Sequence, residues 1–195
     1  MEIEQPLTLF GLWFEEAVES EPTLPDAASL ATATAEGRPS NRVVLVKRVS
    51  AAGFEFHTNY RSRKGEELAA NPWAALTYHW KSLGRAVRME GRVERLSSEE
   101  SDTYWYSRPR ESRISARASE QSQPAGSREE LGTASAAEAE RVGAGEVERP
   151  EHWGGYRLVP VRIEFWTHRE DRFHERVEFR RESVEAKWER GLLQP

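Results

Sequence analysis

Residues 162–176 read RIEFWTHREDRFHER and combine aromatic side chains with arginine and histidine on an apolar pattern. Arg172, His174 and Arg176 are spaced at i, i+2 and i+4. If they belong to one β-strand, its period of two places all three side chains on the same face. Two guanidinium groups and an imidazole on one face suit an anionic ligand, whereas the ordinary alternative is an edge strand whose charges are solvated.

Strands dominate the segments that surround this stretch. Apolar side chains at three-to-four spacing predict a helix at residues 7–19, and serine caps predict further helices at 62–70, 97–108 and 127–141. Short β-rich runs bounded by turns predict strands at residues 29–34, 42–49, 53–59, 73–80, 85–96, 156–167, 173–181 and 186–193. Because strands and helices do not alternate regularly, the sequence favours a mainly β, α+β fold with an antiparallel barrel.

The length and the composition limit the classes of protein. A chain of 195 residues predicts a single domain over residues 1–195, with a mobile, partly helical insertion at about residues 119–152, where Ser, Ala, Gly, Glu and Gln are abundant. The net charge of −5 argues against a general nucleic-acid binder. With 37% hydrophobic residues and seven tryptophans, the composition fits a chain that shares its core with a second subunit.

Several kinds of chemistry are absent from the sequence. Cysteine is missing, which excludes disulfides and thiolate chemistry and suits a reducing cytoplasm. No apolar stretch approaches ~18 residues, so we expect no membrane span and a cytoplasmic protein. The five histidines show no metal-ligand spacing, and we expect no metal site.

Two groups of cations stand where an anion would balance them. Arg42 and Lys47 point to opposite faces of the predicted strand, so they could meet two different anions; strand-end cations that extend into solvent are the ordinary alternative. Arg63 and Lys64 follow Ser62 in the first turn of a predicted helix, where they oppose the helix dipole and are expected to be unpaired. A phosphate bound to the free N–H groups of that helix end would remove the conflict.

Two further groups carry side chains that suit a phosphate. Tyr104 and Arg108 are four residues apart on one predicted helix face, and Ser112 follows shortly after that helix. A phenol, a guanidinium and a hydroxyl can together bind a phosphate, although a plain Tyr–Arg stack is the alternative. Gln121 and Ser122 can hydrogen-bond to a phosphate or to the polar edge of a ring, or can belong to an ordinary loop.

In this order, the segments resemble the pyridoxamine 5′-phosphate oxidase family over nearly the whole chain, from about Pro6 to Pro195. The matching motifs are RVVLVK at 42–47, Thr58-Asn59, Ser62-Arg63-Lys64, Ser107-Arg108-Pro109, Gln121-Ser122, HWGGY at 152–156 and the run at 164–176. The resemblance implies an FMN-binding split β-barrel that acts as a homodimer. It also implies oxidation of pyridoxamine or pyridoxine 5′-phosphate to pyridoxal 5′-phosphate, with oxygen reduced to hydrogen peroxide.

The family's site residues carry over where the motifs match. The resemblance assigns the FMN phosphate to Arg42, Arg63 and Lys64. It assigns the rest of the FMN site, part of it from the partner subunit, to Val43, Val44, Leu45, Lys47, Thr58, Gln121, Ser122, Trp166 and Arg176. It assigns the substrate phosphate to Lys47, Tyr104, Arg108 and Ser112. It assigns the binding of the substrate ring, and the catalytic role at the flavin, to Arg172 and His174.

The sequence departs from the family pattern at four positions. Ala86 replaces a glutamine that faces the flavin. His57 stands where tyrosine is common, Arg117 where tryptophan is common and Glu175 where aspartate is common. The chain also begins after the family's N-terminal segment that covers the substrate, and we expect that cover to be missing. Two alternatives stay open: an FMN-dependent oxidase of another small aromatic compound, of the phenazine-precursor type, and a non-catalytic protein that binds flavin or pyridoxal phosphate.

Overall fold

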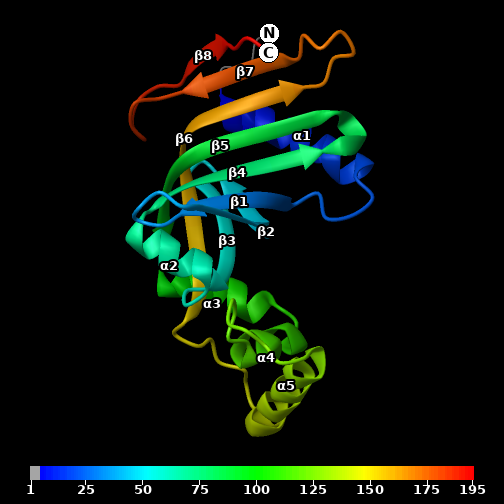
Figure 1. Ribbon diagram of the computed structural model, residues 1–195, viewed down its shortest axis with the longest axis vertical. Helices are drawn as coiled ribbons and strands as arrows, with labels where there is room; N and C mark the ends of the chain where they lie inside the picture. Colours follow the sequence, from blue (N-terminus) through cyan, green and yellow to red (C-terminus); the bar gives the residue numbers. More distant parts are fainter. Residues whose placement is uncertain (1–4) are drawn as a thin grey trace.

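A computed structural model describes residues 5–195 as eight strands and five α-helices (Figure 1). The helices are α1 (Pro6–Ser20), α2 (Arg63–Ala70), α3 (Ser98–Ser107), α4 (Arg110–Ala118) and α5 (Arg128–Val142), with a short 3-10 helix, η1, at Lys81–Leu83. The strands are β1 (Ala27–Ala33), β2 (Pro39–Ser50), β3 (Gly53–Asn59), β4 (Trp73–Trp80), β5 (Arg85–Arg95), β6 (Trp153–Thr167), β7 (Glu175–Arg180) and β8 (Glu189–Leu192).

The strands form one antiparallel sheet that closes on itself. Their order is β3-β2-β1-β4-β5-β6-β7-β8, and an additional pairing of β3 with β6 closes the first six into a barrel. In the closing pair, Phe54 lies opposite Leu158 and Asn59 lies opposite Trp153. β7 and β8 continue the sheet beyond the barrel, along the outer part of β6 (Figure 1). The prediction of a mainly β fold with an antiparallel barrel is confirmed.

Alternate side chains of the strands fill the barrel, and α1 covers this core. Every second residue of β1 is buried, and Leu30 and Leu76 are completely inaccessible to solvent. Phe10 of α1 packs among them, with its ring centroid 5.0 Å from that of Phe54 and 5.2 Å from that of Tyr78. The aromatic face of the helix therefore packs on the core.

A bulge allows the 15-residue strand β6 to serve both the barrel and its extension. Glu90 pairs with Arg162 whereas Gly91 pairs with Pro160, so one residue of β6 is left over at this point. A Cβ atom on Gly91 would lie 2.1 Å from the carbonyl oxygen of Val159. Only glycine permits this close approach of the two backbones.

Helices α3, α4 and α5 lie together at the end of the barrel away from β7 and β8 (Figure 1). They share a small core made of Trp105, Ile114, Val147 and Trp153. The indole Nε1 of Trp105 donates a hydrogen bond of 2.7 Å to the carbonyl oxygen of Val147. Because Trp153 is also the first residue of β6, this core joins the helices to the barrel.

None of the helices in residues 5–195 is long and apolar enough to cross a membrane. Within the predicted insertion at about residues 119–152, residues 128–142 form α5. The prediction that this insertion is mobile, within a single domain, stays a prediction.

Most predicted elements end within three residues of the observed ones, but two interpretations are wrong. The strand predicted at 173–181 begins only at Glu175, and Arg172 has a φ of 66° in the preceding loop. Arg172, His174 and Arg176 therefore do not share one strand face. Helix α4 was not predicted, because it is only nine residues long, is mostly polar and has Ile114 as its one buried residue.

The anchoring role of α1 gives a stability prediction. Phe10→Ala should lower the free energy of unfolding by about 3–5 kcal/mol, because it leaves a cavity among packed aromatic rings. Leu12→Ala, on the same helix but 47% exposed, should change the stability by less than about 1 kcal/mol. Urea unfolding at one fixed protein concentration measures both. Equal losses for the two variants would show that α1 does not depend on Phe10.

Candidate functional site

A cavity of about 930 Å³ lies between the barrel and helices α2, α3 and α4. Its walls come from β2, the end of β3, the first turn of α2, the α3–α4 region and the loop after α4. The predicted site residues that line it are Arg42, Val43, Val44, Leu45, Lys47, Thr58, Arg63, Lys64, Tyr104, Arg108, Ser112, Gln121 and Ser122. Segments from distant parts of the chain therefore meet at one cavity, which is large enough for a cofactor.

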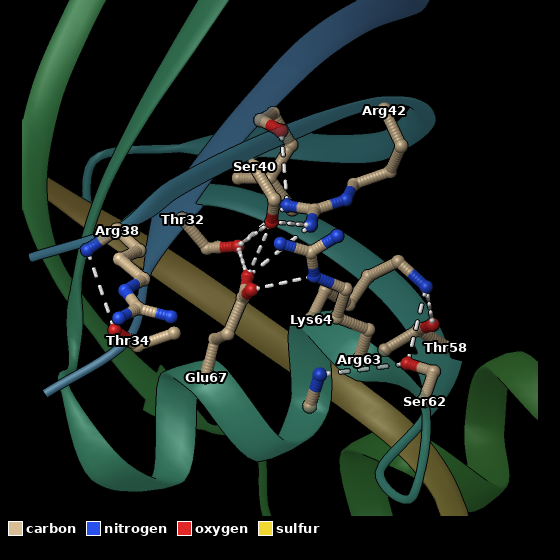
Figure 2. Close-up of polar contacts among 12 residues, drawn as sticks. Thr32, Thr34, Arg38, Ser40, Arg42, Thr58, Ser62, Arg63, Lys64 and Glu67 are labelled. Carbon is tan, nitrogen blue, oxygen red and sulfur yellow. Dashed lines mark hydrogen bonds and ion pairs between the residues drawn. The ribbon is translucent and has the colours of Figure 1, made fainter. Parts of the chain in front are cut away.

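One part of the cavity wall is a cluster of cations around a buried carboxylate (Figure 2). Glu67 is 5% exposed and accepts hydrogen bonds from Arg63 Nε at 2.8 Å and from Arg42 Nη2 at 3.3 Å. Its Oε2 atom also accepts from the hydroxyl groups of Thr32 and Ser40. Burial alone would raise the pKa of Glu67, but these hydrogen bonds lower it to about 2. The carboxylate is therefore ionised throughout the physiological pH range.

The expectation that the cations at this helix start are unpaired is wrong for the two arginines, since both contact Glu67. Lys64, whose side chain is nearly buried, has no carboxylate in contact among residues 5–195. Its Nζ donates to three neutral groups, at 3.0 Å to Thr58, 3.1 Å to Ser62 and 2.9 Å to Gln121. Burial and then the charge of Arg42 lower the pKa of Lys64 to about 8. A buried ammonium without a carboxylate in contact marks a place for an anionic ligand.

The N-terminal end of α2 lies in the same region. Ser62 caps the helix by accepting a hydrogen bond from the backbone N–H of Gly65 at 3.4 Å. Gly65 is required here, because a Cβ atom would lie 2.2 Å from the carbonyl oxygen of Tyr60. The positive end of the helix dipole adds to the charges of Arg63 and Lys64 in the first turn. An anion bound at this end would be stabilised by both.

A second part of the cavity is lined by aromatic rings and one guanidinium group. The imidazole of His57 stacks on Tyr104, with ring centroids 3.9 Å apart, and lies 5.4 Å from Trp153. The guanidinium carbon of Arg108 lies 4.8 Å from the Trp153 ring centroid. Arg108 Nη1 and both ring nitrogens of His57 are buried without a hydrogen-bond partner among residues 5–195. Buried polar groups are normally satisfied, so this corner suits a ligand with hydrogen-bond acceptors.

His57 is one of the departures from the family pattern. Burial, together with the charge of Arg108, lowers the pKa of His57 to about 4, so the imidazole is neutral at neutral pH. A neutral imidazole can donate from one nitrogen and accept at the other. Of the other departures, Ala86 is buried in β5 away from this cavity, and Arg117 forms an ion pair with Glu138.

Lys47 lies at the rim of the cavity and forms a 2.6 Å ion pair with Asp26. Both side chains are partly exposed, and ion pairs of this kind contribute about 0–1 kcal/mol. Lys47 can therefore exchange Asp26 for an anionic ligand at little cost.

Four predicted site residues from the C-terminal stretch do not line the cavity of their own chain: Trp166, Arg172, His174 and Arg176. Arg176 instead holds Glu164 through Nε at 2.8 Å and Nη2 at 2.9 Å. The Nδ1 atom of His174 accepts a hydrogen bond from the backbone N–H of Arg169 at 3.1 Å. A single chain thus does not bring these residues together with the others.

Two of the predicted site residues have a left-handed backbone that side chains rarely adopt. The φ angle is 77° at Ser122 and 66° at Arg172. Each such conformation costs about 1–3 kcal/mol and persists where the surroundings hold it, often at functional sites.

Sequence reasoning missed Glu67, which organises the arginines. Its spacing of four residues from Arg63 on a helix was an available signal, but such pairs are common on exposed faces. The hydroxyl groups of Thr32 and Ser40 come from β1 and β2, and nothing local in the sequence connects them with α2.

The residues present fit the phosphate of FMN, which the sequence pattern implies. Lys64 is buried without an anion, the helix N-terminus adds positive charge, and the Nη1 and Nη2 groups of Arg63 have no partner among residues 5–195. Beside them, Val43 is an apolar side chain that is 66% exposed on the cavity wall. Such a wall suits a flat aromatic ring system.

The buried ammonium gives a pH prediction for the ligand-free protein. The folded-state pKa of Lys64 is about 8 and the unfolded-state value about 10.4, so the cost of burying its charge is full below pH 8 and disappears above pH 10.4. Relative to Lys64→Met, the wild type should gain about 3 kcal/mol of unfolding free energy between these pH values. Urea unfolding at several pH values measures the difference, and a constant difference would contradict the burial of a charged Lys64.

Comparison with known proteins agrees with this geometry. A family model described as pyridoxamine 5′-phosphate oxidase matches residues 14–141, and one described as the pyridoxine 5′-phosphate oxidase C-terminal dimerisation region matches residues 153–195. The pyridoxine/pyridoxamine 5′-phosphate oxidase of Janthinobacterium sp. (strain Marseille) is 50% identical over 190 residues, covering 97% of this chain and 89% of the relative. That of Azorhizobium caulinodans is 48% identical over 192 residues, covering 98% and 91%.

Solved structures are similar over the same range. PhzG from Burkholderia lata 383, in complex with tetrahydrophenazine-1-carboxylic acid, has a TM-score of 0.91 and 33% identity, with 99% of this chain and 94% of that chain covered. A pyridoxamine 5′-phosphate oxidase-related, FMN binding protein from Nostoc punctiforme has a TM-score of 0.79 at 18% identity, with full coverage of both chains, and supports the fold alone. Since the matches span both the barrel and the C-terminal strands, this chain belongs to the pyridoxamine 5′-phosphate oxidase family.

Proposed function

We propose that this protein is an FMN-dependent oxidase that converts pyridoxamine or pyridoxine 5′-phosphate to pyridoxal 5′-phosphate and reduces oxygen to hydrogen peroxide. The observation that carries the proposal is that one cavity has two separate cationic regions, the cluster at the start of α2 and the corner around Arg108. A cofactor and a substrate that each carry a phosphate ester need two such regions. The names of the two relatives described above support an oxidase of this type.

The cluster on α2 is assigned to the FMN phosphate. Arg42, Arg63 and Lys64 would bind its oxygens, and each charge-assisted hydrogen bond contributes about 1.5–3 kcal/mol. The flavin ring would lie along the cavity wall formed by residues 43–45 and Thr58, with Gln121 and Ser122 at its edge. This assignment uses the charge of Lys64, which no carboxylate among residues 5–195 neutralises.

The aromatic corner is assigned to the substrate phosphate. Arg108 can direct its unpartnered Nη1 group at a phosphate oxygen, while Tyr104 and Ser112 offer hydroxyl groups on the same cavity wall. Lys47 would add a second cation by leaving Asp26. These residues hold the substrate at the end away from its reacting carbon, so their binding energy serves orientation.

In the oxidation, the substrate carbon loses a hydride and the attached amine or hydroxyl group loses a proton. Bound FMN would supply the two-electron acceptor and pass the electrons to oxygen. We assign Arg172 to stabilising the charge that develops as the proton leaves, and His174 to holding the substrate ring. With the amine substrate, hydrolysis of the resulting imine by water gives the aldehyde and ammonium.

We further propose a homodimer with two equivalent sites, each completed by Trp166, Arg172, His174 and Arg176 from the partner. The match of residues 153–195 to a dimerisation region supports this arrangement. So does the position of the four side chains, which lie outside the cavity of their own chain. Phe173, which is 74% exposed, and Val43 would provide apolar area for such an interface.

A second candidate is the oxidation of another small aromatic compound that carries no phosphate. The similarity to PhzG, solved with tetrahydrophenazine-1-carboxylic acid, favours it. The two candidates differ in the anion that the unpartnered donor of Arg108 would bind, which is a phosphate ester in the first and a carboxylate in the second.

The test is turnover by the FMN-loaded protein with pyridoxamine 5′-phosphate and with unphosphorylated pyridoxamine, followed by peroxide release. The phosphorylated substrate should be strongly preferred, and Arg108→Ala should raise its KM about 10- to 150-fold, the loss of one charge-assisted hydrogen bond. The KM for pyridoxamine should change little. Arg110→Ala is the matched control, since Arg110 binds the carbonyl oxygens of Gly143 and Gly145 outside the cavity.

Equal losses for both substrates would show that Arg108 does not bind the phosphate. Peroxide release with an aromatic acid, and none with pyridoxamine or pyridoxine 5′-phosphate, would replace the first candidate by the second. FMN binding without turnover of any of these compounds would reject both oxidase proposals.

The shared site can be tested by subunit complementation. The double variant Arg63→Ala/Lys64→Ala should lose FMN, and Arg172→Ala should lose turnover, so each is inactive alone. In a mixed dimer, one site would combine an intact cation cluster with an intact Arg172. An equimolar mixture that exchanges subunits freely should therefore recover roughly a quarter of the wild-type activity. No recovery, with mixed dimers demonstrated by mass, would mean that each site is built from a single chain.

A further inference from the structure

We propose that Glu67 is a positioning residue of the phosphate-binding cluster: it orients the guanidinium groups of Arg42 and Arg63 and sets the net charge of the cluster. The inference rests on the proposed binding of the FMN phosphate at the start of α2. It adds an acidic residue to a site whose recognised members are all cationic or neutral.

The contacts of Glu67 reach both arginines from one buried position (Figure 2). Its Oε1 atom accepts from Arg63 Nε at 2.8 Å, and its Oε2 atom accepts from Arg42 Nη2 at 3.3 Å. Hydroxyl groups of Thr32 and Ser40 also donate to Oε2, and the same two hydroxyl groups accept from Arg42. The carboxylate is therefore fixed by groups from β1 and β2 as well as by the arginines.

Arg63 shows what this contact does. Its side chain is 61% exposed, and a long exposed arginine ordinarily samples many rotamers. The bond from Nε to Glu67 fixes the plane of the guanidinium group, while Nη1 and Nη2 keep no partner among residues 5–195. Arg63 lines the cavity, so these donors are available to a ligand there. Glu67 thus accepts from the Nε–H group of Arg63 and leaves the Nη1 and Nη2 groups, which together suit two phosphate oxygens.

The charge of the cluster also matches a phosphate ester. Arg42, Arg63 and Lys64 contribute three positive charges, and Glu67 removes one of them. The remaining two positive charges balance a phosphate monoester, which carries about −1.5 to −2 at neutral pH. Without Glu67, three cations would repel one another within a largely buried cluster, and Arg42 and Arg63 would have no common anchor.

Two opposing effects make the inference testable. Removing Glu67 raises the positive charge of the site, which by itself would strengthen the binding of FMN. It also frees the guanidinium group of Arg63 and removes one contact of Arg42, which keeps its bonds to Leu30, Thr32 and Ser40. This loss of orientation by itself would weaken binding. The inference is that orientation outweighs charge, so the loss of an acidic residue should reduce the affinity for an anion.

The experiment compares FMN with riboflavin, which has the same ring system without the phosphate. Ligand-free protein is titrated with each flavin, and quenching of flavin fluorescence gives the two Kd values for the wild type, Glu67→Ala and Glu66→Gln. Glu67→Ala should raise the Kd for FMN at least tenfold and the Kd for riboflavin less than twofold. Glu66→Gln, which removes the exposed neighbouring carboxylate of the same helix turn, should leave both values within twofold.

Several results would overturn the inference. An unchanged or lower Kd for FMN in Glu67→Ala would show that charge outweighs orientation. Equal losses for FMN and riboflavin would show that Glu67 only supports the fold of this region. If Glu67→Ala does not fold, Glu67→Gln keeps the size and one acceptor oxygen, and it must show the same FMN-selective loss, smaller in size.

The failure of the proposed function is a different result. A wild-type protein that binds neither flavin would reject the FMN site itself. A wild type that prefers FMN to riboflavin, with a Glu67→Ala variant that keeps the same preference, would reject only the role of Glu67.

Discussion

The pairing of β3 with β6 is the contact on which the rest of this structure depends. It joins segments about one hundred residues apart, since Phe54 lies opposite Leu158, and it converts an open sheet into a barrel. Thr58, at the end of β3, and Trp153, at the start of β6, thereby become neighbours at one end of the barrel. The turn to α2 follows β3 directly, and the core of α3, α4 and α5 contains Trp153. Barrel closure and cavity formation are thus consequences of one strand pairing.

Around that cavity, charge is handled in two ways. The arginines on β2 and α2 share one buried carboxylate, which holds their geometry in the ligand-free protein. Within the described part of the chain, Lys64 and Arg108 have no carboxylate in contact, and each has a pKa lowered chiefly by burial. The first arrangement fixes donors in place, and the second leaves positive charge without compensation. A site that must recognise anions needs both, because orientation without free charge binds weakly and free charge without orientation binds unselectively.

Elements of this fold could be predicted from sequence where local interactions determine them. Strands such as β1 and β4 have a period-two burial pattern, and the serine caps of α2, α3 and α5 are local signals, so these elements were predicted. Helix α4 is short and mostly polar and has one buried residue, so it was not predicted. The loop before β7 has charged side chains at alternate positions, a pattern typical of a strand. The residue types alone do not indicate that Arg172 has a left-handed backbone, which interrupts the strand.

Whether a site residue could be predicted from the sequence also depends on the range of its interactions. Lys64 was predicted because its charge opposes the helix dipole, and Arg42 and Arg108 because of their spacing and because the motif order resembles a known family. The structure places all three at one cavity, and their binding roles stay predictions. Glu67 was not found, because its hydroxyl partners come from distant strands. Arg172 and His174 do not line the cavity of their own chain. Their proposed placement against the cavity of a partner is not specified by any pattern within one chain.

If the proposed anionic ligand binds at Lys64, the buried ammonium would tie the amount of folded protein to the supply of that ligand. A ligand that binds only the folded chain stabilises it by mass action, by about 2.7 kcal/mol at a concentration one hundred times its Kd. Chains synthesised in excess of that ligand would keep the cost of a buried charge and would unfold more often. Proteolysis of the unfolded state would then remove the empty chains first, so that the abundance of the protein would follow the abundance of the ligand.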